Sequence, residues 1–360
     1  MKRRAFLVGG LAAPALLRPS AAADAPLPQR VLGRTGLAAS ALGFGCTDVR
    51  DPAVYRRAVD LGVTCFLLNH DAKRQNPEAA AALLPFRNRI VVGCLTNVRG
   101  SSKAMEQELD AFLAMSGFGH VDLWYFVTPT PSLRDTFVEA FAEARREGKA
   151  RFAAITTHDP SNHLDALVAA GSPIDAVMLV HNFTTSPEVS AQVDRLHAAG
   201  LAVTPMKPMA GNFTTEKTGE TDAQHAAALR WLVADARVGC VPTVMTSLLQ
   251  VEANAAAVRV PFSREDGAVL RAWTPRVSER FCRDCGTCAG SCPSGVAVPG
   301  LVRAVMYAEG YGDLDRARRE VRAIPAGRCR SACSACPACT VRCPHGVDVR
   351  ARALRALALA

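Results

Sequence analysis

The strongest constraint on this 360-residue chain is a cysteine pattern, C-x2-C-x2-C-x3-C-P, that occurs twice near its end. The first copy consists of Cys282, Cys285, Cys288 and Cys292, and the second consists of Cys333, Cys336, Cys339 and Cys343. Nine of the 13 cysteines lie between residues 282 and 343, so the count describes a local site and not a disulfide framework spanning the chain.

This spacing is typical of proteins that hold two [4Fe-4S] clusters. Three thiolates on a tight loop reach three corners of one cubane, while the cysteine before proline is directed toward the other cluster. By that rule one cluster takes Cys282, Cys285, Cys288 and Cys343, and the other takes Cys333, Cys336, Cys339 and Cys292. Two zinc sites or disulfides are the alternatives, although zinc sites usually lack the third cysteine at the same short step. Cys329 falls outside both copies and leaves a shifted ligand register open.

The charge of this region fits an anionic cofactor. From Arg271 onward the chain has 15 Arg, no Lys and 7 acidic residues, a net charge of +8. Two oxidised clusters, each carrying about −2 with its thiolates, absorb about half of that charge. No aromatic platform or recognition motif accompanies the arginines, so we expect no nucleic-acid partner. Between the two motifs, residues 299–324 predict a helix, a glycine-marked turn and a second helix.

Residues 1–23 predict an export signal. A basic start with Arg3 and Arg4 precedes a short apolar run, residues 5–17, and three alanines end at Ala23. The arginine pair resembles the twin-arginine (Tat) pattern, which implies transport of a folded, cofactor-loaded protein to the periplasm. A Sec signal or an uncleaved anchor is the alternative, but the run is short for a membrane span. We therefore expect no stable membrane span after cleavage.

From residue 38 to about 250 the chain alternates short β-rich runs with Ala-, Leu-, Glu- and Arg-rich helical stretches, which indicates repeated βα units in a domain that we place at residues 30–262. The eight predicted strands are residues 39–46, 64–69, 89–96, 121–128, 151–157, 176–182, 202–208 and 240–246. Eight such units predict a (β/α)8 barrel with its chemistry at the C-terminal strand ends. An open doubly wound sheet is disfavoured because no G-x-G-x-x-G follows the first strand. Residues 263–280 are expected to form a linker or helix, and residues 281–360 the two-cluster domain.

The segments RVLGRTGLAASALGFGC, VDLWYF, ALRWLVAD and SLLQVEAN, at residues 30–46, 121–126, 228–235 and 247–254, resemble aldo/keto reductases in order and spacing. The cysteine-rich continuation resembles the subgroup with a twin-arginine signal and a C-terminal 4Fe-4S domain. The resemblance implies a TIM barrel followed by a small, mostly α-helical ferredoxin-like domain. It also implies hydride transfer from NADPH to a carbonyl, with a Tyr acid, a Lys–Asp pair and an orienting His.

This sequence departs from the family at each position of that tetrad. The Asp aligns with Leu67, the Tyr with Ala72, the Lys with Leu95 or Thr96, and the His with about Val127. Since none of these side chains can replace the tetrad's acid or base, the inherited chemistry is not expected.

The nucleotide contacts are only partly retained. Thr156, Thr157, Met178 and Val244 replace family residues, whereas the positions that match are Asn182, Thr246, Gln250 and Asn254. NADP(H) binding is therefore left open but unsupported, and export weakens it further because free NADPH is not expected outside the cytoplasm.

A different polar set follows the predicted strands. It comprises Asn69, His70, Asp71, His158, Asp159, His181, Asn182 and Lys207, the last placed within a strand. We nominate His158, His181, Lys207 and His70 as catalytic candidates that donate protons, bind an anionic substrate or ligate a metal. The structural alternative is that His158 and Asp159 form a helix-capping turn and that His181 only lines the mouth.

Two main classes of function are consistent with the sequence. The first is an exported iron–sulfur oxidoreductase whose clusters exchange electrons with a small-molecule substrate at the barrel mouth. The second is an electron carrier for a redox partner protein, with the barrel as a docking scaffold. An NADPH-dependent carbonyl reductase is a third, and it requires an acid that the aligned positions do not supply.

Overall fold

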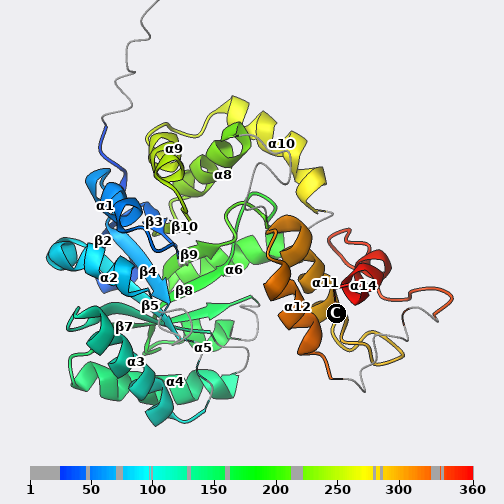
Figure 1. The fold of residues 1–360 in the computed structure, drawn as a ribbon, viewed down its shortest axis with the longest axis horizontal. Helices are drawn as coiled ribbons and strands as arrows, with labels where there is room; N and C mark the ends of the chain where they lie inside the picture. Colours follow the sequence, from blue (N-terminus) through cyan, green and yellow to red (C-terminus); the bar gives the residue numbers. More distant parts are fainter. Residues whose placement is uncertain are drawn as a thin grey trace, which may run out of the picture.

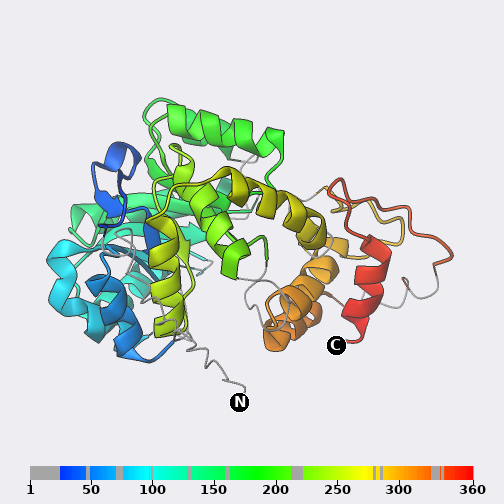
Figure 2. The ribbon, with the colours of Figure 1, turned by 90° about the horizontal axis from the view of Figure 1, so that it is seen from above.

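The computed structural model describes residues 25–45, 49–69, 76–96, 98, 100–127, 131–158, 163–211, 222–278, 281–283, 287–325, 333 and 336–359. These residues form a barrel and a smaller helical lobe at the C-terminus (Figures 1 and 2). Several positions singled out in the sequence lie outside the described residues: the predicted signal at 1–23, His70, Asp71, Ala72, Asp159, Cys285 and Cys329.

The barrel is a sheet of eight parallel strands. In spatial order these are β10 (Val241–Thr243), β3 (Leu42–Phe44), β4 (Cys65–Asn69), β5 (Val91–Thr96), β6 (Val121–Val127), β7 (Ala150–Thr157), β8 (Ile174–Val180) and β9 (Ala202–Met206). The sheet closes between β9 and the residues before β10: Val203 forms a parallel bridge with Val238, and its carbonyl accepts from the Gly239 amide at 2.9 Å. The predicted (β/α)8 barrel is confirmed.

Helices surround the sheet and divide the core into two layers. They are α1 (Pro52–Asp60), α2 (Pro77–Leu83), η2 (Leu84–Arg89), α3 (Ser102–Ser116), α4 (Pro131–Arg146), α5 (Leu164–Val168), α6 (Pro187–Ala198), α8 (Asp222–Ala234) and α9 (Leu248–Val258). Because strand side chains alternate, Trp124 and Phe126 pack outward against α4, while Leu123 and Tyr125 fill the barrel interior. The interior is therefore a packed core.

The first predicted strand was wrong in its extent. Its beginning, β2 (Ala38–Ser40), pairs antiparallel with β1 (Gln29–Val31) in a hairpin around the 3-10 turn η1 (Gly33–Thr35), and only β3 enters the barrel. The chain leaves the hairpin at Ser40, whose side chain and amide exchange hydrogen bonds with Thr64 at 2.9 and 2.8 Å. A β-rich run thus serves two sheets because side-chain bonds replace the ladder at the bend.

The C-terminal lobe follows α10 (Arg264–Ser278), which lies in the range expected to be a linker or helix. Its elements are α11 (Val298–Val305), the π-helical turn η4 (Met306–Gly310), α12 (Leu314–Arg322) and α14 (Val349–Leu357). Both ribbon views show these helices, orange to red, beside the barrel and reached through the yellow α10 (Figures 1 and 2). Valines of α11, α14 and the loops before them form the lobe's own core. The expected helix, turn and helix between the cysteine motifs is present.

Candidate functional site

The two cysteine motifs build the same local structure twice. In the first, the Gly295 amide donates to the Cys292 carbonyl at 2.9 Å, and in the second, the Gly346 amide donates to the Cys343 carbonyl at 3.2 Å. Both glycines have a positive φ, 66° and 78°, which favours glycine over residues with a Cβ. A helix follows each turn, α11 in the first copy and α14 in the second, and the two helices pack on each other. The repeat found in the sequence is therefore also a structural repeat.

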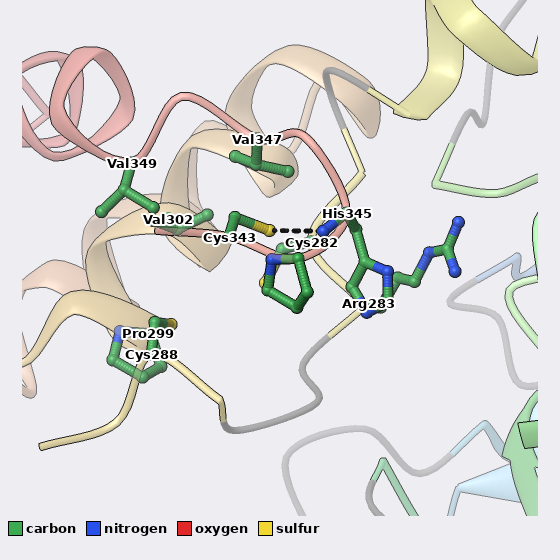
Figure 3. Close-up of a pocket in the computed structure, with 10 residues that line it drawn as sticks. Cys282, Arg283, Cys288, Pro299, Val302, Cys343, His345, Val347 and Val349 are labelled. Carbon is green, nitrogen blue, oxygen red and sulfur yellow. Dashed lines mark hydrogen bonds between the residues drawn. The ribbon is translucent and has the colours of Figure 1, made fainter. Parts of the chain in front are cut away.

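Cysteines of both motifs line a pocket in the lobe, which we call the first cysteine pocket because it holds two cysteines of the first motif. Cys282, Cys288 and Cys343 line it together with Pro299, Val302, Val347 and Val349 (Figure 3). The His345 amide donates to the Cys343 Sγ at 3.4 Å, the dashed contact in Figure 3. The structure thus brings the proline-preceding cysteine of the second motif to two cysteines of the first, while Cys285 lies outside the described residues.

A second group forms around Cys333. Burial, followed by interactions with the nearby thiols of Cys292, Cys339 and Cys336, raises the pKa of the Cys333 thiol. Cys292 comes from the first motif, so this group is also mixed between the motifs. The arrangement corresponds to the crossed ligand sets expected from the spacing, and ligation itself stays a prediction.

The groups fit a four-iron cluster by the chemistry of their donors. Thiolates that lie close together repel one another, so each thiol resists losing its proton. Bound iron offsets this repulsion and lets the cysteines bind as thiolate ligands. The Nε of Arg350 is buried and has no hydrogen-bond partner among the described residues, and its charge favours the thiolate form of Cys333. Both features suit an anionic group beside Arg350. Among the described residues, no three His, Cys, Asp or Glu side chains are placed to hold a single metal ion.

The structure does not bring all the proposed barrel residues to one place. His158 directly follows β7 and is half-buried. Strand alternation puts it on the interior side with Ala154 and Thr156, at the mouth. Lys207 was expected within a strand, but β9 ends at Met206, and Lys207 begins a turn with φ 56°.

His181 lies outside the barrel mouth. Its ring packs on Trp231 of α8 with centroids 5.2 Å apart, and its Nε2 lies 3.0 Å from the Asp235 carboxylate. Burial opposes ionisation of Asp235, but hydrogen bonds from Arg237 and His181 outweigh it and hold the pKa of Asp235 well below its usual range. The nomination of His181 as a mouth residue is therefore corrected: Val177 and Leu179 of β8 pack outward against the helices, and His181 continues that outward face.

The matching nucleotide positions are engaged within the protein. Asn182 is buried, and its Nδ2 donates to the Lys207 carbonyl at 2.9 Å, which holds the turn at the mouth. The Gln250 Oε1 accepts from the Thr246 amide at 2.7 Å and from its hydroxyl at 3.0 Å. Asn254 is half-buried on α9. These contacts neither show nor exclude a bound nucleotide.

The tetrad positions within the described residues are apolar or structural. Leu67 is buried in the barrel interior, Leu95 packs against the same cluster, and Val127 is half-buried at the end of β6. Thr96 points the other way, and its hydroxyl donates to Glu108 of α3.

The junction between the lobe and the barrel was not predicted from the sequence. Phe281, directly before Cys282, is 1% exposed and belongs to a hydrophobic cluster shared by the mouth residues Val180 and Met209 and the lobe residue Met306. The Lys207 Nζ lies 5.5 Å from the centroid of the Phe281 ring. The sequence feature that could have indicated this junction is the aromatic residue Phe281 directly before the first cysteine of the motif.

Two glycines let the backbones meet at this junction. A Cβ on Gly211 would lie 2.8 Å from the Phe281 ring, and one on Gly310 would lie 2.5 Å from the Gly211 carbonyl oxygen. Charges of the barrel and the lobe also interact across this junction. Burial and Arg283 lower the pKa of His345 in the lobe, whereas Glu188 of α6 in the barrel raises it. The first cysteine pocket therefore adjoins the C-terminal ends of the barrel strands.

Comparisons with known proteins agree with this two-part architecture. Residues 90–227 match the aldo/keto reductase family, and residues 281–347 match the 4Fe-4S dicluster domain. An aldo-keto reductase from Bacillus halodurans in its holo form is similar at a TM-score of 0.59 and 19% identity, over 68% of this chain and 96% of that one. An aldo-keto reductase from Klebsiella pneumoniae in complex with NADPH is similar at a TM-score of 0.58 and 18% identity, over 68% and 94%. At these identities the similarity shows the fold alone.

A curated relative matches only part of this protein. It is a component of the H(2):CoB-CoM heterodisulfide,ferredoxin reductase of Methanothermobacter thermautotrophicus, and it is 38% identical over 72 residues, which cover 20% of this chain and 35% of that protein. The chain thus spans about a third of the relative's length. None of the helices in the described part of the chain is long and apolar enough to cross a membrane.

Proposed function

Since this chain joins an aldo/keto reductase domain to a 4Fe-4S dicluster domain, we propose that it is an iron–sulfur oxidoreductase that exchanges electrons with a substrate at the barrel mouth. The junction is the observation that carries the proposal. Phe281 packs between the first cysteine pocket and Lys207 at the mouth, inside one hydrophobic cluster. A non-catalytic scaffold does not require the cysteine pocket to face the end of the barrel where substrates bind.

The residues of the lobe have separate tasks in this proposal. When bound, the clusters would accept or release one electron at a time. The cysteine thiolates would hold them, and Pro299, Val302, Val347 and Val349 would exclude water from the first site. The backbone amide of His345 would donate to a ligand sulfur, which favours negative charge there.

The barrel residues would serve the substrate. Lys207 holds a positive charge between the mouth and the first cysteine pocket, which suits an anionic substrate. His158 follows β7 on the interior side, where an imidazole can exchange protons with a bound molecule. Asn182 keeps the Lys207 turn in place through its hydrogen bond to the backbone. With apolar residues at the aligned tetrad positions, this chemistry differs from the hydride transfer of conventional aldo/keto reductases.

Anaerobic analysis of the full chain tests the proposal. Iron and labile sulfide would be counted, and a reductive titration would be followed by electron paramagnetic resonance (EPR). We expect about eight iron atoms and eight sulfides per chain, as two four-iron clusters require. Zinc, or no metal, in carefully handled protein contradicts the assignment.

Variants then separate an enzyme from a carrier. His158→Ala and Lys207→Ala should weaken small-molecule binding and slow its electron exchange, while His120→Ala, before β6 at the opposite end of the barrel, should not. One observation favours an electron carrier: Leu67, which aligns with the catalytic Asp of aldo/keto reductases, is an apolar residue buried inside the barrel. It becomes the better interpretation if neither mouth variant has an effect. Rapid NADPH oxidation with a simple aldehyde would instead favour a conventional reductase.

We also propose export by the twin-arginine route, supported by Arg3 and Arg4 before the apolar run and by a cofactor that is loaded before transport. Arg3→Lys with Arg4→Lys keeps the charge but removes the pattern. The double variant should stay in the cytoplasm while the parent reaches the periplasm. Equal fractionation of the two contradicts this route.

A further inference from the structure

The structural repeat permits a position-by-position comparison of the two cysteine groups. Ser291 and Arg342 correspond, because the Ser291 hydroxyl donates to the Cys288 carbonyl at 2.9 Å and Arg342 donates to the Cys339 carbonyl at 2.5 Å. Counting from the last cysteine of each motif, Pro299 of α11 corresponds to Arg350 of α14. At both of these equivalent places the second half therefore carries an arginine where the first half has a neutral residue, and of the two arginines Arg342 is exposed whereas Arg350 is half-buried.

Arg350 is bound to the second group through the backbone. Its Nη2 donates to the Cys336 carbonyl at 2.8 Å, and its Nη1 lies 3.4 Å from the Pro337 carbonyl. The side chain is half-buried, and its Nε is buried without a hydrogen-bond partner in the described part of the chain. The guanidinium thus touches the loop of the second group while keeping one unused donor.

The corresponding place in the first half is apolar. Pro299 lines the first pocket with Cys282, Cys288 and Cys343, and it has no donor and no charge. Arg283 also lines this pocket, but Figure 3 shows its guanidinium directed away from the three cysteines. Among the described residues that line the first pocket, none places a cation at the position equivalent to that of Arg350 in the second half.

We propose that Arg350 makes the two cluster sites inequivalent by raising the reduction potential at the Cys333, Cys336, Cys339 and Cys292 site above that at the Cys282, Cys285, Cys288 and Cys343 site. The inference rests on the proposed two-cluster function. One-electron reduction adds one negative charge to a site, and a fixed positive charge nearby stabilises that form. The first electron therefore resides at the Arg350 site. The site beside the barrel mouth is the stronger reductant.

The test is an EPR-monitored reductive titration of the anaerobically prepared full chain, with variants in both halves. Arg350→Gln keeps a hydrogen-bonding side chain but removes the charge, and Arg350→Lys keeps the charge but loses the planar fork. The matched control Arg342→Gln removes an exposed arginine of the same loop. Pro299→Arg adds a charge to the first half at the start of a helix, where proline is not required.

Arg350→Gln should weaken electron binding at the higher-potential step about tenfold, which is about 59 mV for one electron. Arg350→Lys should retain most of the parent value, and Arg342→Gln should shift it less than Arg350→Gln. Pro299→Arg should raise the lower of the two midpoint potentials, so that the difference between the two potentials becomes smaller.

Unchanged midpoints in both Arg350→Gln and Pro299→Arg, at full iron and sulfide content, overturn the inference and leave the proposed function standing. Fewer than two clusters in the parent chain overturns both. If Arg350→Gln loses its cluster, Pro299→Arg decides alone, because it leaves Arg350 in place.

Discussion

Truncating Phe281 to alanine should separate the lobe from the barrel mouth. The ring is 1% exposed and is packed so closely on Gly211 that a Cβ there would lie 2.8 Å from it. It also lies under the Lys207 ammonium, 5.5 Å from the ring centroid. Alanine removes both contacts and leaves a cavity between the two parts of the protein.

The expected size follows from the burial of this side chain. Removing a fully buried phenylalanine costs about 3–5 kcal/mol, which includes the cavity that remains. A loss of about 4 kcal/mol changes the ratio of docked to undocked lobe by about a thousandfold. Since the shared cluster joins Phe281 to Met306 and Ala210, most of that loss falls on the junction and not on either core.

Hydrogen exchange measured by mass spectrometry reads this quantity locally. Peptides that contain residues 207–211 and 306–310 should exchange much faster in Phe281→Ala, including the Ala210 amide that donates to the Lys207 carbonyl at 3.0 Å. Phe118→Ala is the matched control, because Phe118 is buried against Phe112 in the outer barrel core, away from the lobe. Exchange within about twofold of the parent in both junction peptides would refute the reasoning.

Three further outcomes are expected. Asp235→Asn should lower the free energy of unfolding at pH 7 by roughly 2 kcal/mol, because its hydrogen bonds with Arg237 are charge-assisted. Since the pKa of Asp235 is lowered on folding, the parent should lose this advantage as pH falls below about 4, and denaturant titrations at pH 7 and pH 3 should show the difference shrink. Cys343→Ala should halve the iron content by emptying the pocket that holds Cys282, whereas Cys292→Ala should empty the other site; loss of the same EPR signal in both variants contradicts crossed ligation. Gly33→Ala should destabilise the barrel by about 1–3 kcal/mol, because φ is 49° and a Cβ would lie 2.4 Å from the Ala202 amide nitrogen; an unchanged melting temperature contradicts this.

Local patterns were sufficient for the architecture. Buried parallel strands are rich in consecutive apolar residues, such as residues 123–127 of β6, so they can be recognised without any knowledge of their neighbours. The cysteine motifs are equally local, since the spacing that suits a cluster is contained in one loop. The first strand was predicted too long because residues 39–46 carry one apolar run through two sheets.

The position of single side chains depended on contacts far apart in the sequence. His181 faces α8 because it continues the outward-facing positions Val177 and Leu179 of β8, and its partner Asp235 is 54 residues away. A shift of one residue moves a side chain from the barrel mouth to its outside, and periodicity does not resolve strand ends to that accuracy.

By itself, the sequence determined a barrel, a helical cysteine-rich tail and two equally spaced motifs, because periodicity and spacing act over a few residues. Only the tertiary structure decided that Phe281 seats the first cysteine pocket on the barrel mouth and that Arg350 lies on the second group. Those relations follow from packing between distant segments, where burial and charge act through space and leave no local pattern in the chain.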